Sequence, residues 1–273
     1  MESQPNLKAL FLGDVVGRPG RRAVLFFLPQ LIAQRQPDLV VVNAENAADD
    51  GLGLLLEHYS ELRALGVDVV TTGNHVWEKT ELNELLEKED RLLRPANYPS
   101  RLPGRGLVIF TLERGPHIGT EVAVLNLQGR YRMSPIDDPF RAGFQLVEET
   151  RKKTKLIFID FHAEDFSEKE AFPWAMDGTV TGVVGTHTHV ATQDARILPR
   201  GCAAQTDLGM CGPLNSVIGS RPDLSIERSL TAVPLRNEVL EGPAEVRGLW
   251  IAADTETGCA VLVESLCLGP YGV

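Results

Sequence analysis

The chain has 273 residues, of which 43% are hydrophobic and 23% charged, and its formal net charge is −10 at pH 7. This composition is ordinary for a soluble globular protein that can bury a sizeable core. The acidic balance argues against duplex nucleic acid as a partner, although bound divalent metals can still attract a small anionic substrate.

The sequence also argues against a membrane location. No run approaches the roughly 20 apolar residues that span a bilayer, and residues 1–6 lack the basic and apolar regions of a signal peptide. We therefore expect a cytoplasmic protein with no membrane partner. No C-x-x-C spacing occurs among the four cysteines, so we expect small buried hydrophobic residues in a reducing compartment at Cys202, Cys211, Cys259 and Cys267.

Strands and helices are predicted to alternate through the first half of the chain. Residues 8–13 form a short apolar strand ending at Asp14. Gly17, Pro19 and Gly20 then turn the chain into a helix with apolar residues at a spacing of three to four. Further helices are predicted over about 54–65, 78–89 and 139–152. Gly66 is expected to cap the first of these. Further strands are predicted over 39–42, 67–70, 106–113, 121–127, 155–159 and 179–184.

The second half of the chain is richer in β-structure. Short β-like runs dominate from about residue 195, at 195–198, 202–205, 245–253 and 260–265. The loop 206–215 is too long and glycine-rich for a simple turn, so we expect it to wall a site. Residues 39–42 suit a parallel strand covered on both faces, and 106–113 with 121–127 suits a hairpin. We predict one α/β domain over residues 1–273, with a layered β-sheet core flanked by helices.

Residues with metal-ligand chemistry follow five of the predicted strands. They are Asp14, Glu45 with Asn46, Asn74 with His75, His162, and His187 with His189. Because ligands bind beyond the carboxyl ends of strands in such sheets, these side chains are expected to converge. Two carboxylates, two amide oxygens and three ring nitrogens exceed the three protein ligands of one catalytic metal. They suit two metals about 3.5–4 Å apart.

The histidine pair His187 and His189 follows an apolar run that reads as a buried strand. In extended backbone the side chains at i and i+2 share a face, so both rings are expected to point into one cavity. Each candidate also fits a structural role when taken alone, such as a turn residue for Asp14 or a hydrogen-bonded core residue for His162. The repetition of the pattern at five strand ends favours the metal site.

The ordered motifs resemble those of calcineurin-like metallophosphoesterases over most of the chain, which implies an α/β/β/α sandwich. The matching elements are Gly13-Asp14, Gly73-Asn74-His75, His162 and Gly185-Thr-His-Thr-His189. Two elements depart from the usual pattern. Asp14-Val15-Val16 replaces Asp-x-His, and Asn43-Ala44-Glu45-Asn46 replaces Gly-Asp-x-x-Asp. Together with Thr206–Pro213, these departures make the chain similar to the YmdB-like branch, described as 2′,3′-cyclic-nucleotide 2′-phosphodiesterases with a di-iron or di-manganese centre.

The resemblance implies a division of the ligands between two metal ions. One ion would be held by Asp14, Asn46 and His189, the other by Asn74, His162 and His187, and Glu45 would bridge them. Iron or manganese is expected, and zinc also fits this mixture of nitrogen and oxygen ligands. Asp49 and Asp50 stand where the resemblance leads us to expect small residues, so the rim of the cavity should differ here.

The expected reaction is hydrolysis of a small phosphodiester, a 2′,3′-cyclic nucleotide, to a 3′-nucleotide. A metal-bridging hydroxide would attack, because two cations lower the pKa of water from ~15.7 towards ~7. His75 adjoins Asn74 but is assigned to no metal, which makes it the candidate general acid for the departing 2′-oxygen.

Alternatives are a phosphatase, a hydrolase of another phosphodiester or of a pyrophosphate, and a metal- and nucleotide-binding regulator with little turnover. A homo-oligomer paired through the C-terminal strands is left open.

Overall fold

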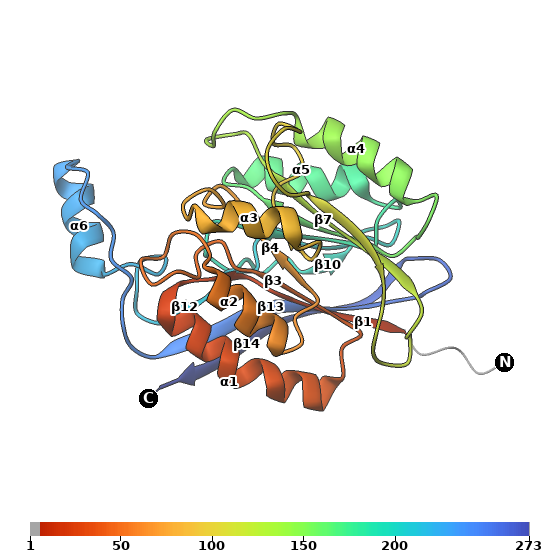
Figure 1. The fold of residues 1–273 in the computed structure, drawn as a ribbon, viewed down its shortest axis with the longest axis horizontal. Coiled ribbons are helices and arrows are strands. Elements are labelled where there is room, and N and C mark those ends of the chain that lie inside the picture. The colour runs from red at the N-terminus through yellow and green to blue at the C-terminus, as the bar shows by residue number, and fades with distance from the viewer. Residues whose placement is uncertain (1–5, 273) are drawn as a thin grey trace.

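Two β-sheets packed face to face form the core of the structure, a computed structural model that describes residues 6–272 (Figure 1). Within this range the first sheet has eight strands, in the order β2-β12-β13-β1-β3-β4-β5 with β14 paired to β13. Their bounds are β1 (Leu7–Leu12), β2 (Asp14–Val15), β3 (Leu39–Asn43), β4 (Val69–Thr71), β5 (Leu92–Leu93), β12 (Met210–Pro213), β13 (Ala244–Ala253) and β14 (Ala260–Tyr271).

The second sheet has six strands in the described range, in the order β10-β11-β9-β8-β7-β6. Its three central strands β7, β8 and β9 run parallel. The bounds are β6 (Leu107–Thr111), β7 (Glu121–Gln128), β8 (Ile157–His162), β9 (Gly182–Thr186), β10 (Arg196–Ile197) and β11 (Ala203–Gln205).

Helices cover the outer face of each sheet. The first sheet packs against α1 (Gly17–Arg35), α2 (Leu56–Ala64) and α3 (Glu81–Lys88), and the second against α4 (Pro139–Thr150) and α5 (Phe166–Met176). A third apolar cluster fills the space between the sheets. The predicted fold class is therefore confirmed, with its layers in the order helix, sheet, sheet, helix.

Alternation along the central strands explains why their sequences are apolar throughout. Phe11 faces the layer between the sheets and lies 5.5 Å from Phe158 of the opposite sheet, whereas its neighbours Leu10 and Leu12 pack under the helices. Because successive side chains point to opposite faces, a strand covered on both faces needs apolar residues at every position. The parallel pairing of β1 with β3 and of β3 with β4 follows this expectation.

Several local predictions are confirmed. β6 and β7 pair antiparallel as a hairpin, with Leu107 opposite Leu125. Gly66 has a φ of 92° just beyond α2, as a residue that ends a helix in the left-handed conformation should. The loop predicted over 206–215 is only partly a loop, because it contains β12, which pairs with β2 and β13.

Two helices depart from the predicted β-rich second half. α5 contains Pro173, buries Lys169 and exposes Trp174, so its apolar residues do not form one face. Helix α6 (Pro222–Thr231) buries no residue and stands away from the rest of the molecule (Figure 1). Neither helix has the one-sided apolar pattern by which amphipathic helices are found in a sequence.

The cysteine prediction is correct for two residues and wrong for the others. Cys202 and Cys211 are buried, but Cys259 is half-buried and Cys267 is exposed. Cys267 lies on β14, where β14 is the edge of its sheet beyond β13 and much of it faces solvent.

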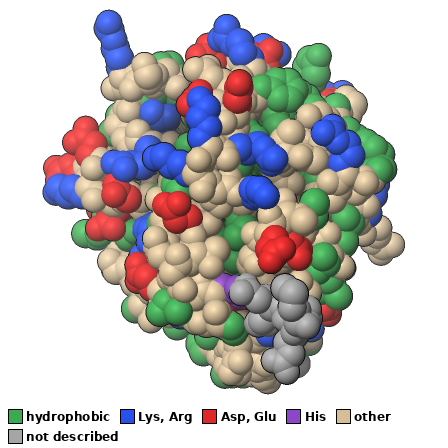
Figure 2. Space-filling model, turned by 90° about the vertical axis from the view of Figure 1, so that its right-hand side faces the viewer, with side chains coloured by type: hydrophobic (Ala, Val, Ile, Leu, Met, Phe, Trp, Pro, Cys, Tyr) green, Lys and Arg blue, Asp and Glu red, His purple; other side chains and the backbone are tan. Residues whose placement is uncertain are grey.

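The surface carries charges of both signs. Several Lys and Arg side chains lie among Asp and Glu side chains on the face that Figure 2 shows, although the net charge is −10. No helix in residues 6–272 is long and apolar enough to cross a membrane.

Candidate metal centre

The predicted ligands converge where the strands of the two sheets end. Asp14 lies in β2, His162 is the last residue of β8, and Glu45 lies two residues beyond β3. All three side chains are at least 99% buried. Asn74 follows β4, and His187 comes directly after β9. The two sheets therefore bring together residues that are up to 173 positions apart.

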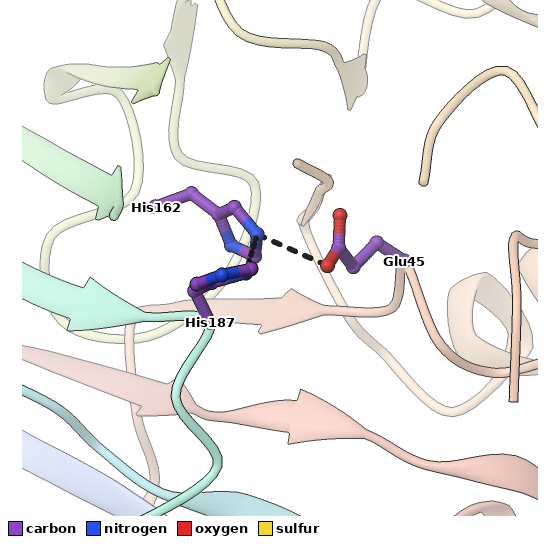
Figure 3. Close-up of side chains that lie close together, drawn as sticks. All are labelled: Glu45, His162 and His187. Carbon is purple, nitrogen blue, oxygen red and sulfur yellow. Dashed lines mark hydrogen bonds and ion pairs between the residues drawn. The ribbon is translucent and has the colours of Figure 1, made fainter. Parts of the chain in front are cut away.

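Three candidate ligand atoms lie close to Nε2 of His162, which is itself the fourth. Its Nε2 lies 3.0 Å from Glu45 Oε1, 3.1 Å from Asn74 Oδ1 and 3.0 Å from His187 Nδ1. Figure 3 shows the rings of His162 and His187 turned towards the carboxylate of Glu45. One ring nitrogen carries at most one hydrogen, so it cannot donate to three acceptors. Lone pairs that face one another in this way fit a bound cation.

Outer hydrogen bonds set which nitrogen of each ring faces this group. Thr186 Oγ1 donates to Asp160 Oδ1 over 2.7 Å, so it accepts from His162 Nδ1 at 2.9 Å and leaves the lone pair of Nε2 directed inward. His187 Nε2 lies 3.2 Å from the carboxylate of Glu164, which leaves Nδ1 free on the inner side. Partners of this kind orient the histidines of metal sites.

Asn46 and His189 form a second group, and Asp14, whose Oδ2 accepts from the backbone N–H of His187 at 3.1 Å, is the third residue predicted to serve it. His189 Nε2 lies 3.3 Å from Asn46 Oδ1, while its Nδ1 donates to the carbonyl oxygen of Ile218 at 2.8 Å. Asn46 Nδ2 donates to the carbonyl oxygen of Gly51, which turns Oδ1 towards the histidine. Asp14 Oδ1 is buried without a hydrogen-bond partner in the described chain. This donor set also fits a cation.

The histidine pair reaches the site by a route that the sequence did not predict. Strand β9 ends at Thr186, and His187 and His189 have φ values of 100° and 65°, so the backbone is not extended there. The prediction that the two rings share a strand face is therefore wrong. Instead, the turned backbone sends His187 to the group around His162 and His189 to the group around Asn46.

A buried ion pair holds this turn in place. Lys169 Nζ donates to the carbonyl oxygen of Thr186 and to Asp207 Oδ2, each at 2.5 Å. The same carboxylate oxygen accepts from the backbone N–H of Thr188 at 3.1 Å. The pair thus fixes the backbone on both sides of His187, where positive φ is unfavourable for a residue with a side chain. Sequence reasoning flagged the loop of Asp207 only as a wall and missed Lys169, Asp160 and Glu164.

Burial and charge shift the pKa values of the buried ligands in opposite directions. Burial raises the pKa of Asp14 to about 6. Burial also opposes the charge on Glu45, but the charge and hydrogen bond of His162 lower the pKa of Glu45 to about 2. Burial would lower the pKa of His162, yet Glu45, Asp14 and Asp160 raise it. Burial and the charge of His162 lower the pKa of His187 to about 3, so this ring stays neutral as a ligand must.

His75 lies beside the two groups rather than within them. Its backbone N–H donates to Glu45 Oε2 at 3.1 Å, and its ring Nδ1 lies 3.4 Å from Glu78 Oε1. The side chain is 28% exposed and lines a pocket of about 510 Å³, together with Glu45, Asn46, His187 and His189. Asp50 also lines this pocket, as expected, whereas Asp49 turns away to pair with Arg21.

The two-sheet sandwich and the donors at its strand ends define a calcineurin-like metallophosphoesterase. Residues 10–266 match the family described as YmdB-like protein, and the chain belongs to this family. It is 43% identical to the 2′,3′-cyclic-nucleotide 2′-phosphodiesterase of Bacillus subtilis (strain 168), over 96% of this chain and 97% of that protein.

Two solved structures resemble the whole chain. One is a novel phosphatase from Mycoplasma pneumoniae, with a TM-score of 0.90, 36% identity and coverage of 98% of this chain and 95% of that one. The other is a hypothetical protein from Thermus thermophilus, with a TM-score of 0.88, 38% identity and coverage of 97% and 100%.

Replacing Gly73 by alanine should abolish metal binding, because the added Cβ would overlap the ring of His162 and the carboxylate of Glu45. Metal content measured after incubation with manganese should fall to less than one ion per chain. Gly182→Ala is the control, since the nearest atom to its Cβ would be the end of the Ile251 side chain, at 3.0 Å, and its contacts with Ala203 would be ordinary ones of 3.4 Å or more. Full metal loading of Gly73→Ala would contradict the geometry described here.

Affinity for divalent metal should fall as the pH drops below about 6. A cation needs Asp14 ionised, whereas in the metal-free protein burial holds the pKa of this carboxyl at about 6. Each pH unit below that value should cost about tenfold in affinity for the proton displaced from Asp14, and the raised pKa of His162 adds to this loss, because a cation must displace the proton of that ring as well. The free energy of unfolding of the metal-free protein should instead rise as the pH falls towards 5. The folded state binds the Asp14 proton more tightly than the unfolded state does, so protonation favours the folded state. Chelator competition between pH 7.5 and 5 measures the first effect, and an affinity that does not change would refute the assignment of Asp14.

Proposed function

We propose that this protein hydrolyses 2′,3′-cyclic nucleotides to 3′-nucleotides with the help of two metal ions. The convergence of unshared lone pairs around His162 Nε2, at the base of a pocket of about 510 Å³, is the observation that carries the proposal. Membership of the YmdB-like family makes the enzyme a metal-dependent phosphoric diester hydrolase. The substrate follows the name of the Bacillus subtilis relative.

Each metal would have its own set of protein ligands. Asn74, His162 and His187 would hold one ion, and Asp14, Asn46 and His189 the other, with Glu45 between them. When bound, the two cations would supply Lewis acidity and activate the attacking water. The ligands are nitrogen and oxygen atoms without sulfur, which suits iron or manganese and also zinc.

The position of His75 supports a role as general acid. Glu78 Oε1 lies 3.4 Å from Nδ1, where it can accept the hydrogen of that nitrogen and orient the ring, which remains 28% exposed in the pocket. In the proposed reaction the Nε2 hydrogen of the His75 imidazolium passes to the 2′-oxygen as this oxygen leaves the phosphorus. Transfer of this proton leaves the phosphate on the 3′-oxygen.

Hydrogen bonds from neighbouring residues hold the proposed histidine ligands in position before any metal ion binds. The carboxylate of Glu164 and the hydroxyl of Thr186 direct the inner nitrogens of His187 and His162 towards the group around Glu45. The ion pair between Lys169 and Asp207 holds the backbone between these rings and His189. A site that is fixed in advance spends little of its binding energy on ordering its own groups.

Activity on three substrates tests the proposal. The protein, supplemented with manganese or ferrous iron, should release 3′-AMP from 2′,3′-cyclic AMP and hydrolyse bis-p-nitrophenyl phosphate faster than p-nitrophenyl phosphate. His189→Ala removes a ligand and should lower metal content and activity together. Release of 2′-AMP would refute the proposed regiochemistry, and activity confined to the monoester would favour the phosphatase reading, which the name of the Mycoplasma structure also suggests. Two bound metals without turnover on any of the three would favour a regulatory protein.

His75→Ala should retain both metals and lose about 10²–10⁴-fold in turnover of 2′,3′-cyclic AMP, because general acid catalysis typically contributes this much. Bis-p-nitrophenyl phosphate has a good leaving group that needs little protonation, so its hydrolysis should suffer much less. His117→Ala is the matched control, since His117 is a buried histidine outside the pocket. Equal losses on both substrates, or full activity on both, would remove His75 from the role of proton donor.

A further inference from the structure

One wall of the candidate active-site pocket comes from the long connection between β12 and β13, residues 214–243, which contains α6. We call this connection the α6 excursion. Arg236, Asn237 and Val239 line the pocket together with the loop that carries Asn46. Val239 packs against this loop so closely that its methyl groups would lie within 2.9 Å of a Cβ on Gly17 or Gly51. Hydrogen bonds from Leu240 N to Gly219 O and from Arg221 N to Glu238 O, both 2.9 Å, fix the wall to the start of the excursion.

The same excursion contacts a candidate metal ligand. The carbonyl oxygen of Ile218 accepts from His189 Nδ1 at 2.8 Å, and Ile218 lines the pocket beside it. Within the described chain Ser220 pairs with Val239, so the segment that holds His189 and the segment that walls the pocket form one unit. A substrate that contacts this wall would therefore sit against a surface rigidly connected to the metal site.

Arg236 is the one Lys or Arg side chain that lines this pocket in residues 6–272. Its side chain is 81% exposed and makes no hydrogen bond within that range, and its only ion pair is a distant one, 3.7 Å, to Asp50 Oδ2. Asp50 is already neutralised by Lys79, which donates to both of its carboxylate oxygens at 2.8 and 3.0 Å. The guanidinium of Arg236 thus has donors and charge that the protein itself does not use.

Arg236 also lies near the candidate metal ligands. Asp50 precedes Gly51, whose carbonyl oxygen accepts from Asn46 Nδ2 at 2.8 Å. A pocket of about 510 Å³ is large enough for a ligand of nucleotide size. In a 2′,3′-cyclic nucleotide the 5′-carbon projects from the end of the ribose opposite to the cyclic phosphate. With the cyclic phosphate at the candidate metal ligands, the 5′-oxygen is directed away from them but stays within the pocket that Arg236 lines.

We infer that Arg236 binds a second phosphate group, on the 5′-oxygen of the substrate, so that the enzyme prefers 2′,3′-cyclic nucleotides that are also phosphorylated at the 5′ position. This inference rests on the proposed function and names the substrate class of the same site. A planar guanidinium with free donors matches the geometry of phosphate oxygens. Stacking of the base on a Phe, Tyr or Trp ring is not available, because none of these residues lines the pocket within residues 6–272.

Two sources supply this chemistry, a 5′-phosphorylated mononucleotide and the 3′-terminal nucleotide of a cleaved RNA strand. The first carries a dianionic phosphomonoester and the second a monoanionic diester at the same oxygen. Both place negative charge opposite the metal ligands, so both should be preferred over 2′,3′-cyclic AMP. The relative preference between them identifies the source.

The experiment compares kcat/KM on three substrates: 2′,3′-cyclic AMP, the same nucleotide with a 5′-phosphate, and a dinucleotide that ends in a 2′,3′-cyclic phosphate. The metal-loaded wild type should prefer the 5′-phosphorylated substrate or the dinucleotide by about 10- to 100-fold, as a charge-assisted hydrogen bond implies. Arg236→Ala should reduce this preference to about one, and Arg236→Lys should retain part of it.

Arg141→Ala is the matched control, because this arginine is 75% exposed with one distant ion pair of 3.9 Å to Asp137, and it lies outside the pocket. It should keep both the activity and the preference of the wild type. A wild type that does not discriminate, or an Arg236→Ala variant that still does, would overturn the inference.

A second measurement separates failure of this inference from failure of the proposed function. This measurement determines how strongly adenosine 3′,5′-bisphosphate and, separately, 3′-AMP inhibit the hydrolysis of bis-p-nitrophenyl phosphate. The bisphosphate should inhibit at about 10- to 100-fold lower concentration than 3′-AMP in the wild type and at a similar concentration in Arg236→Ala. If the wild type leaves cyclic nucleotides intact, the proposed substrate is wrong, and the inhibition still decides whether Arg236 binds a second phosphate.

Discussion

Two carboxylates buried at strand ends, Asp14 and Glu45, impose the main constraint on this structure. A charge removed from water is costly unless it is paired or coordinates a metal. Glu45 has the ring of His162 at 3.0 Å, and burial leaves Asp14 with a pKa near 6. The groups around these two carboxylates are ring nitrogens and amide oxygens, which can bind a metal ion. This arrangement fits bound cations that would balance the buried negative charge.

A ring of hydrogen bonds outside these ligands gives the centre its shape. Acceptors that differ in chemistry, namely a hydroxyl, a carboxylate and a backbone carbonyl, hold the outer nitrogens of His162, His187 and His189. The common result is an inward lone pair on each ring. The buried pair of Lys169 and Asp207 adds the backbone turn that lets two histidines of one loop serve different groups.

The excursion around α6 connects this centre with the pocket. Ile218 contacts His189, and Val239 closes the wall over the loop of Asn46, so one segment affects both a metal ligand and the space for substrate. α6 itself buries no residue, and its base rather than its length contributes to the site. Arg236 lies on this segment, and the phosphate contact proposed for its guanidinium would give the segment a role in choosing the substrate.

The sequence by itself determined the layers and the chemistry. Continuous apolar strands such as residues 39–42 indicate a sheet covered on both faces, because alternation leaves no polar side to expose. Ligand-type residues at the ends of such strands indicate a metal site, because the carboxyl ends of parallel strands share one edge. The predicted ligands that converge in the structure were found in this way, and their roles as ligands stay predictions.

Only the tertiary structure decided how the residues reach one another. The left-handed backbone at His187 and His189 depends on Lys169 and Asp207, which are 38 positions apart and meet only after the sheets have formed. Glu164, Asp160 and Arg236 acquire their roles from neighbours that are distant in sequence, so no local pattern marks them. Helices α5 and α6 were missed for a related reason, since they lack a one-sided apolar face and owe their positions to the rest of the chain. Periodicity reports which faces are buried, whereas contacts between distant segments fix backbone turns and the free donors of a charged side chain.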